Sequence, residues 1–354
     1  MIGFRKANKD DNDSLILLQR KCPQGTNLIL GLDSSPDYFA RSKPYEDWRV
    51  FVAVENDKII GSAGCAVRDT FVGGRLLKTA FLYGLMVDPQ HRRKGIAKKL
   101  HTNLEQFALK RDVDLIYLIV TEENIPSMNL VANMGFRRVK DCAVFSLMVY
   151  KKHLDTGDGV VRSMVEDDVP KVVDLINNTF HDYDFFAPFE IDDFVEYVER
   201  MPFFNLKNIQ VLEEDGDVKA CLGYWDYNKI VRFTVEKFNW RMKMLSLTTK
   251  ILGLFTEMPG IPKPGETLKS YSLTTPAYED IESIARLIEH VDNIALKEGI
   301  RFLNMPIDPQ SPIATVVSKF KHATVKLHIF VKKLKRRSLP DFAGRSLNID
   351  VIDV

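Results

Sequence analysis

The sequence predicts an α/β (α+β) protein with two tandem domains, each a mixed, largely antiparallel sheet flanked by helices. Three observations lead to this prediction. The chain has 354 residues, which suits two domains of ordinary size. Similar patterns of strands and helices occur in both halves, in the same order. In the first half alone, the stretch VDPQHRRKGIAKKL (87–100) joins an apolar strand to a helix through a cationic loop that contains a glycine.

The overall composition and charge are those of an ordinary globular protein without a general preference for nucleic acid or membrane. Hydrophobic residues make up 45% of the chain and charged residues 27%, as in ordinary globular domains. The net charge of +1 gives no general reason to expect nucleic acid or membrane as a partner. Residues 1–156 carry 24 Lys and Arg against 18 Asp and Glu, whereas the remainder carries 25 against 30. We therefore expect an anionic partner for the first half only.

The cysteines predict a reducing compartment. Cys22, Cys65, Cys142 and Cys221 are far apart and show no Cys/His spacing typical of a metal site. They are expected to be reduced, buried thiols of a cytoplasmic protein without a bound metal. The N-terminal stretch MIGFRKANKDD has no apolar segment typical of a signal peptide.

The internal repeat starts with a short strand and a helix. FRKANKDDNDSLILLQRKC (4–22) resembles VRSMVEDDVPKVVDLINNTF (161–180). In both stretches, carboxylates stand where the helix is expected to begin and apolar residues follow at helical spacing. Negative charge is favourable at that end of a helix because the backbone dipole is positive there.

Two further pairs of segments follow in the same order. FVAVENDKIIGSAGCAV (51–67) parallels IQVLEEDGDVKACLGYW (209–225), and each predicts a β-hairpin with a tight turn. KRDVDLIYLIV (110–120) parallels KEGIRFLNMPI (297–307), where the end of a helix leads into an apolar strand. Three matched segments in one order favour a duplication.

The offsets between the copies locate an insertion and the domain boundaries. The offset grows from 157–159 residues before the second hairpin to 187 after it, which predicts about 28 inserted residues within 226–268. This insertion contains WRMKMLSLTTKILGLF, a predicted helix. We expect a first domain over 1–153 and a second over 160–336. The tail, 337–354, ends in an alternating apolar and polar pattern that predicts an edge strand.

The stretch 87–100 has the parts of an anion site. A strand (80–87) ends at Asp88-Pro89, cations follow, and apolar residues at helical spacing place the start of a helix near Gly95. A helix N-terminus offers unpaired N–H groups and a positive dipole end. Glycine lets an anion approach the backbone. Neither GxxxxGK[ST] nor GxGxxG occurs here, so the two common nucleotide-binding loops are excluded.

This arrangement resembles the acyl-CoA loop of the GCN5-related N-acetyltransferase (GNAT) superfamily, whose signature is [QR]xxGx[GA]. Residues 92–97 match it, and LIYLIVTEENIPSMNLVANMGFRR (115–138) resembles the next block of the superfamily. The resemblance covers residues 3–152. Across the whole chain the sequence resembles the Hookless-type acetyltransferase-like proteins of plants, which also carry a divergent second half.

The resemblance implies acetyl-CoA as cosubstrate and a primary amine as acceptor, attacked directly in a ternary complex. The implied cofactor-binding residues come from the end of the first-domain strand, the cationic loop and the start of the next helix: Leu85, Met86, Val87, Arg92, Arg93, Lys94, Gly95, Ile96, Ala97, Asn124 and Ser127. A backbone N–H near Leu85–Val87 would polarise the thioester carbonyl.

The usual acid and base of the superfamily are not found at their positions. Val131 stands where many relatives have a tyrosine that protonates the thiolate, and Tyr83 stands near the position of a common glutamate base. The remaining catalytic candidates are Tyr83, Glu122 and Glu123. His91 lies in the loop and is expected to pack or cap there.

The acceptor pocket is expected from segment 23–48, in which Asp33 and Tyr38 are the main candidates to contact the amine. HDYDFF (181–186) is expected to face the same cleft. In the second copy, an offset of 187 places Glu279, Asp280 and Glu282 against the cationic loop, so no CoA should bind there. That domain would wall the acceptor site or serve only as structure.

Two other functions remain open on the residues alone. One is an acyl-CoA-binding regulatory or scaffold protein without turnover, which the absent acid and base favour. The other is a nucleic-acid module that uses the basic loop, although no aromatic platform accompanies the cations. The oligomeric state and the identity of the amine do not follow from the sequence.

Overall fold

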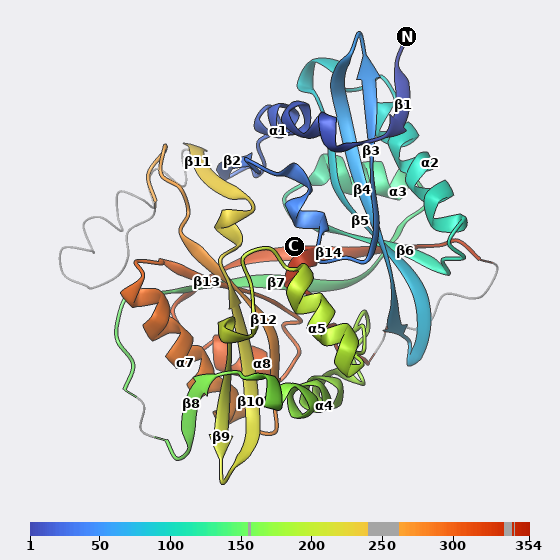
Figure 1. Cartoon of the computed structure of the whole chain (residues 1–354). Coiled ribbons are helices and arrows are strands. Elements are labelled where there is room, and N and C mark those ends of the chain that lie inside the picture. The colour runs from blue at the N-terminus through green and yellow to red at the C-terminus, as the bar shows by residue number, and fades with distance from the viewer. Residues whose placement is uncertain (155–156, 240–261, 336–341, 343) are drawn as a thin grey trace.

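The computed structural model of the chain describes residues 1–154, 157–239, 262–335, 342 and 344–354. A twelve-stranded sheet runs through the whole molecule in the order β1-β3-β4-β5-β6-β14-β7-β13-β12-β10-β9-β8. Figure 1 shows the first half at one end of this sheet, the second half at the other, and the C-terminus where they meet. The predicted mixed, largely antiparallel α/β fold with two similar halves is confirmed.

The first half contains seven strands of this sheet or its small companion, with three helices. Its elements are β1 (Gly3–Lys6), α1 (Asn12–Arg20), β2 (Leu28–Asp33), β3 (Asp47–Glu55), β4 (Lys58–Val72), β5 (Arg75–Val87), α2 (Ile96–Leu109), β6 (Leu115–Thr121), α3 (Ile125–Asn133) and β7 (Arg137–Met148). A short 3-10 helix, η2 (Tyr38–Ser42), lies between β2 and β3.

The second half repeats this order. Its elements are β8 (Val160–Ser163), α4 (Val169–Phe180), α5 (Ile191–Arg200), β9 (Ile209–Glu214), β10 (Asp217–Trp225), β11 (Arg232–Phe238), β12 (Ser270–Tyr278), α7 (Ile281–Lys297), β13 (Phe302–Ile307), α8 (Ile313–Val317) and β14 (His322–Lys333). β11 falls in the predicted insertion and pairs with β2 of the first half. The helix predicted over 240–255 lies outside the described residues.

The same arginine–aspartate contact stands before the first helix of each half. Asp11 accepts hydrogen bonds from the Arg5 guanidinium at 2.6 and 2.7 Å and from the Asn8 amide at 2.8 Å. Asp168 accepts the equivalent bonds from Arg162 at 2.7 and 2.8 Å and from a backbone amide at 2.9 Å. In each case a strand arginine is tied to the acidic turn before the helix, which lowers the pKa of the aspartate through that hydrogen bond.

Each half completes its sheet with a strand from the other half. β14, the last strand of the second half, pairs with both β6 and β7. β7, the last strand of the first half, pairs on its other side with β13. Side chains follow the backbone: Phe330 of β14 packs in the core of the first half, and Phe145 and Leu147 of β7 pack in the core of the second.

Both halves contain a pair of parallel strands that diverge. β5 and β6 pair only over Thr79–Phe81 with Leu115–Tyr117. β12 and β13 pair only over Ser270–Ser272 with Phe302–Asn304. We call the divergent part of β5 and β6, residues 82–87 and 118–121, the first splay. The divergent part of β12 and β13, residues 273–278 and 305–307, is the second splay.

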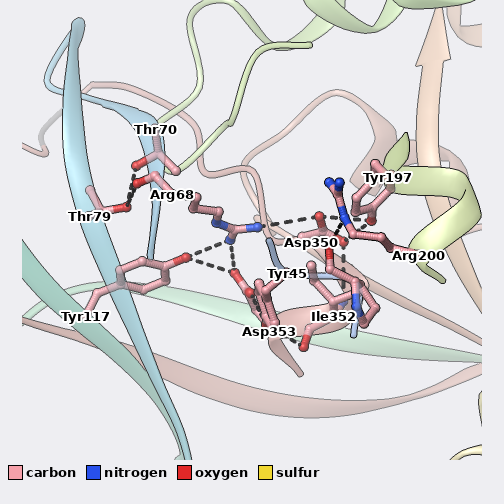
Figure 2. Close-up of polar contacts among 11 residues, drawn as sticks. Tyr45, Arg68, Thr70, Thr79, Tyr117, Tyr197, Arg200, Asp350, Ile352 and Asp353 are labelled. Atoms are coloured by element: carbon pink, nitrogen blue, oxygen red, sulfur yellow. Dashed lines mark hydrogen bonds and ion pairs between the residues drawn. The ribbon is translucent and has the colours of Figure 1, made fainter. Parts of the chain in front are cut away.

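The C-terminal tail does not form the predicted edge strand. It makes one isolated bridge, Leu347 to Asp184, and ends in a 3-10 helix over Val351–Asp353. The physical reason is its carboxylates, which are buried between the halves. Asp353 pairs with Arg68 and accepts a hydrogen bond from the Tyr45 hydroxyl at 2.8 Å, and Asp350 lies 3.6 Å from the same guanidinium (Figure 2).

These contacts join four segments that are distant in sequence. Figure 2 shows Arg68 from β4 between the two tail carboxylates, with Tyr117 of β6 and Tyr197 of α5 beside them. Burial, partly offset by Arg68, raises the pKa of Asp350 to about 6. The guanidinium is therefore the main positive charge that stabilises the buried tail.

Isolated residues 1–153 should not fold cooperatively, because without β14 the edges of β6 and β7 and the apolar contacts of Phe330 are missing. The measurement is thermal unfolding of the 1–153 fragment by circular dichroism, beside the full chain. We expect one cooperative transition for the full chain and none for the fragment. A cooperative transition in the fragment would contradict the importance of the strand exchange.

Arg68→Met should destabilise the protein by about 3–5 kcal/mol, because it leaves two buried carboxylates without their cation. Arg138→Met removes an exposed pair with Asp141, formed at 2.7 Å, and should cost about 0–1 kcal/mol. Urea unfolding of both variants gives the comparison. Equal losses would mean that the tail contacts contribute no more than a surface ion pair.

Candidate functional site

The first splay contains a bulge in β5. Ser62 pairs with Met86 and Gly64 with Tyr83, so Gly84 and Leu85 stand opposite the single residue Ala63. Gly84 adopts a φ of +61°, which glycine tolerates at no steric cost. The bulge frees part of the backbone from the ladder, and Leu85 is 39% exposed. The predicted residues Leu85, Met86 and Val87 therefore line the first splay.

The cationic loop turns sharply before α2. Arg93 has a φ of +65° and Gly95, the N-cap of α2, a φ of +76°. Nothing lies within 4 Å of the position where a Cβ on Gly95 would stand, so the space beside this backbone is open. The first amides of the helix have no intrahelical acceptor. The loop is thus shaped to hold an anion on backbone N–H groups.

The loop cations are available for a ligand. Arg92, Arg93 and Lys94 are exposed, and in the described parts of the chain no carboxylate pairs with them; only the Arg92 Nε donates to the Val87 carbonyl at 3.3 Å. His91 instead has its Nε2 3.2 Å from Glu55, which agrees with the packing role expected for it. Ile96 is buried and Ala97 is partly exposed in the first turn of α2.

The start of α3 provides a second helix N-terminus near the end of β6. Asn124 is its N-cap, and the Asn124 side chain accepts a hydrogen bond from the Ser127 amide at 3.2 Å. Val131, farther along the helix, is buried in the first-half core and has no proton to donate. The usual acid of the superfamily is therefore absent from this helix position.

Residues 21–27, which we call the crossing segment, pass over the end of the first splay. On the β5 side, Lys21 pairs with Asp88 at 3.3 Å and the Cys22 thiol lies 3.5 Å from the Val87 carbonyl. On the β6 side, Thr26 and Asn27 donate to Glu123. Glu123 thus holds this crossing segment, and Glu122 faces Lys326 at 3.9 Å. The structure does not bring either carboxylate together with Tyr83.

Tyr83 points to the η2 side of the sheet and remains protonated. Its hydroxyl donates to the Ser42 Oγ at 2.7 Å, and its ring stacks on Tyr45 at 5.8 Å. Gly64 makes room for the ring, because a Cβ there would lie 2.5 Å from it. Burial raises the pKa of Tyr83, so its phenolate is not available as a base near neutral pH.

Tyr38 lies over the bulge, as the prediction of an acceptor-side residue requires. Its hydroxyl is 3.2 Å from the Ser62 Oγ and 3.8 Å from the position of a Cβ on Gly84. Asp33 lies farther out and is already neutralised: it pairs with Arg20 at 3.0 Å and with Arg232 at 3.1 Å. Burial alone would raise the pKa of Asp33. Hydrogen bonds from Ser35 and from both arginines instead hold this pKa well below its usual range.

Sequence reasoning missed several residues around Tyr83. Arg41 lies with its Cζ 5.6 Å from the Tyr83 ring centroid, and Ser42 and Tyr45 contact the same side chain. The signal in the sequence was weak, since ARSKPY reads as an ordinary polar loop. Its one uncommon feature is an arginine with tyrosines three and four residues away, at Tyr38 and Tyr45.

The second splay has lost the features of the first. Its bulge places Thr275, with a φ of +47°, and Pro276 opposite Leu222, so Pro276 occupies the position of Leu85. Proline has no N–H to polarise a carbonyl. Only two residues separate β12 from α7, against eight between β5 and α2, and the Asp280 side chain caps the helix by accepting from the Ser283 amide at 2.9 Å.

This geometry corrects the alignment of the two copies by an offset of 187. Pro276 matches the bulge of β5 and not the loop residue Pro89, because β5 and β12 are related by an offset of 191 at their paired ends. The second copy therefore lacks the cationic loop altogether. The shortened connection, rather than acidic substitutions within a retained loop, accounts for its different chemistry.

A cavity of about 290 Å³ lies at the second splay between the two halves. Both halves and the tail contribute to its wall, including Tyr45, Arg68, Tyr183, Phe186 and Asp350. HDYDFF (181–186) therefore faces an interdomain cleft, separated from Tyr83 by the ring of Tyr45.

Within the described ranges, no helix is long and apolar enough to cross a membrane. The same parts of the chain contain no cluster of three or more His, Cys, Asp or Glu side chains suited to a metal ion.

The family profile described as "Acetyltransferase (GNAT) family" matches residues 17–136, the part that contains the first splay and the cationic loop. The "Probable N-acetyltransferase HLS1-like" of Arabidopsis thaliana is 20% identical over 266 residues, which cover 69% of this chain and 64% of that protein. "N-acetyltransferase 8" of Homo sapiens is 33% identical over 89 residues, 25% of this chain and 38% of that protein. The chain thus spans less than two thirds of either relative.

Solved structures share the fold over nearly the whole chain. N-myristoyltransferase of Saccharomyces cerevisiae with bound myristoyl-CoA superposes with a TM-score of 0.68 at 12% identity, covering 96% of this chain and 84% of that one. A GCN5-related N-acetyltransferase from Anabaena variabilis gives a TM-score of 0.54 at 9% identity, covering 94% and 72%. Residues 17–136 therefore match the acetyltransferase (GNAT) family model, and the solved structures show a shared fold over nearly the whole chain.

Proposed function

We propose that the protein is an acetyl-CoA-dependent N-acetyltransferase that acts on a primary amine by direct attack in a ternary complex. The observation that carries the proposal is that one splay combines a bulged strand, an open glycine turn and unpaired loop cations. The match of residues 17–136 to an acetyltransferase family supports acyl transfer from a CoA thioester in general. The acetyl group and the domain assignment, with CoA in residues 1–153 and a degenerate copy in 160–336, are part of the proposal.

The proposed roles follow from position along the first splay. Backbone groups of residues 85–87 pair with the pantetheine arm, and the Leu85 N–H polarises the thioester carbonyl. The pyrophosphate lies on the loop of Arg92, Arg93, Lys94 and Gly95 and on the first turn of α2. Asn124 and Ser127, at the start of α3, border the cofactor on the β6 side.

Proton transfer in this proposal does not use the candidate side chains directly. Tyr83 keeps its proton, and Glu122 and Glu123 are occupied by Lys326 and by the crossing segment. We therefore assign the removal of the amine proton to water at the partly exposed bulge. The second half contributes a wall of the acceptor side through β11, which pairs with β2.

The proposed location is the cytoplasm. All four cysteines are free and buried. Burial raises the pKa of the Cys65, Cys142 and Cys221 thiols, so they remain protonated and inert. Four unoxidised thiols favour a reducing compartment.

Gly95→Glu should weaken CoA binding by at least about 10-fold, because a carboxylate would stand beside the phosphates at the helix N-terminus. Gly216→Glu is the matched control: Gly216 also has a φ near +80° and open space at its Cβ position, but it lies in the hairpin turn of the second half. Both variants bear the same backbone strain. Isothermal titration with CoA measures the difference, and equal affinities would remove the loop assignment.

A second candidate function is an acyl-CoA-binding protein without turnover, which the buried Val131 and the protonated Tyr83 favour. Thiol release from acetyl-CoA, measured over a panel of primary amines at pH 6 to 9, separates the two. We expect release that rises with pH as the amine loses its proton. Tight CoA binding with no release for any amine would instead support the binding protein.

A further inference from the structure

Two arginines flank one stack of tyrosine rings next to the first splay. Tyr45 and Tyr83 stack with their centroids 5.8 Å apart. The Arg68 Cζ lies 5.9 Å from the Tyr45 ring, and the Arg41 Cζ lies 5.6 Å from the Tyr83 ring. The pair therefore places one guanidinium at each end of the same aromatic stack.

The two guanidinium groups differ in their counter-charges. Arg68 has two carboxylates, Asp350 and Asp353, both from the tail. Arg41 pairs with no carboxylate in the described parts of the chain, and its Nε is buried without a hydrogen-bond partner. A buried guanidinium N–H without a partner, on a cation without a counter-charge, is costly in the free protein. Its retention beside a binding site is explained if a ligand brings the missing anion.

The surroundings of Arg41 come from both halves. Its electrostatic neighbours are the tyrosines Tyr38, Tyr45 and Tyr83 of the first half and Tyr227 of the second. None of them supplies a negative charge near neutral pH, because burial raises the pKa of each hydroxyl. Arg41 is partly exposed, so a ligand can reach it.

Arg41 stands on the acceptor side of the reacting centre. It follows Tyr38 by one turn of η2, and the Tyr38 hydroxyl lies over Gly84 of the bulge. The cofactor phosphates cannot be its partner. Val87 is four residues beyond Tyr83, about 13 Å along an extended strand, and the phosphate loop begins only after it.

We propose that Arg41 binds a carboxylate of the acceptor, so that the substrates are amines that carry a carboxylate close to the reacting nitrogen, as free amino acids do. This inference rests on the acetyltransferase function proposed above and names its acceptor class. The planar guanidinium suits a carboxylate because it can donate two parallel hydrogen bonds. The Tyr83 ring lies beside the Arg41 guanidinium, and the buried Arg41 Nε has no hydrogen-bond acceptor.

The same cation helps to prepare the nucleophile. A positive charge a few ångströms from an ammonium group favours its neutral form. The neutral amine then attacks the acetyl carbon: the C–N bond forms, the C–S bond breaks, the nitrogen loses one proton to water, and the thiolate takes up one. Arg41 acts by binding and by charge in this scheme, and it transfers no proton.

The first experiment compares free amino acids with their carboxamides as acceptors for acetyl-CoA. For wild type we expect kcat/KM to favour the acids by about 10- to 100-fold, the size of a charge-assisted bidentate contact. Arg41→Met should reduce this preference to within about 2-fold, and Arg41→Lys should keep part of it. Arg49→Met is the control, because the exposed Arg49 bonds only to the Trp48 carbonyl. Equal use of acids and amides by wild type overturns the proposal.

A binding experiment keeps the two proposals separate. Calorimetry measures CoA binding first, and then the binding of N-acetyl-amino acids and their amides to the CoA complex. Arg41→Met should leave the CoA affinity unchanged and abolish the preference for the acids. If the wild-type protein does not bind CoA, the proposed function itself is refuted. Normal CoA binding with no preference for the acids would refute only the role of Arg41.

A third arm tests the other source of a carboxylate, which is the acyl group. Succinyl-CoA replaces acetyl-CoA, with a neutral amine as acceptor. We expect succinyl-CoA to be used no better than acetyl-CoA, and Arg41→Met to leave that ratio unchanged. A preference for succinyl-CoA that Arg41→Met removes would overturn the acceptor assignment. Thermal unfolding checks the variant, which should melt no lower than wild type because an uncompensated charge is lost.

Discussion

The exchange of β7 and β14 is the constraint on which the rest of the structure depends. Each of these strands carries the pattern of one half and completes the sheet of the other. The first splay is bounded by β6, and β6 is held on its outer edge by β14 from the second half. The position of the proposed acyl site is thus fixed by residues more than two hundred positions away in the chain. The two similar halves share one sheet, and Arg68 pairs with the tail carboxylates at their junction.

Much of the fold and the loop could be predicted because their signals are local. The hairpin turns at Asn56-Asp57 and Asp215-Gly216 have the positive φ values that their residue types favour. The start of α2 at Gly95 follows from a strand, a proline and helical spacing within twenty residues. Such features depend on the near neighbours of each residue, which the sequence displays directly. The strand exchange depends on which sheet edge β14 pairs with. The alternation of apolar residues along β14 would be the same beside either half, so it does not reveal the partner.

The candidate site was predictable only in its cofactor-binding part, for the same reason. Asp33 was expected to contact the amine, but Arg232 neutralises this carboxylate from a distant segment. Arg41 was not identified, because what distinguishes it is that no carboxylate pairs with it in the described parts of the chain. The sequence does not show which side chains surround an arginine, so this feature needs the structure. The tail does not form an edge strand because two of its aspartates, Asp350 and Asp353, pair with the partly buried Arg68.

The strand exchange also sets the timing of folding during synthesis. Two hundred residues separate the end of β6 at Thr121 from the start of β14 at His322. A ribosome that adds about 5–20 residues per second needs roughly 10–40 s to make them. Until β14 is made, the edge of β6 that pairs with it is open, and the sheet of the first half cannot be completed. We therefore expect β6 and β7 to be the segments that most need protection from other chains until β14 has been synthesised.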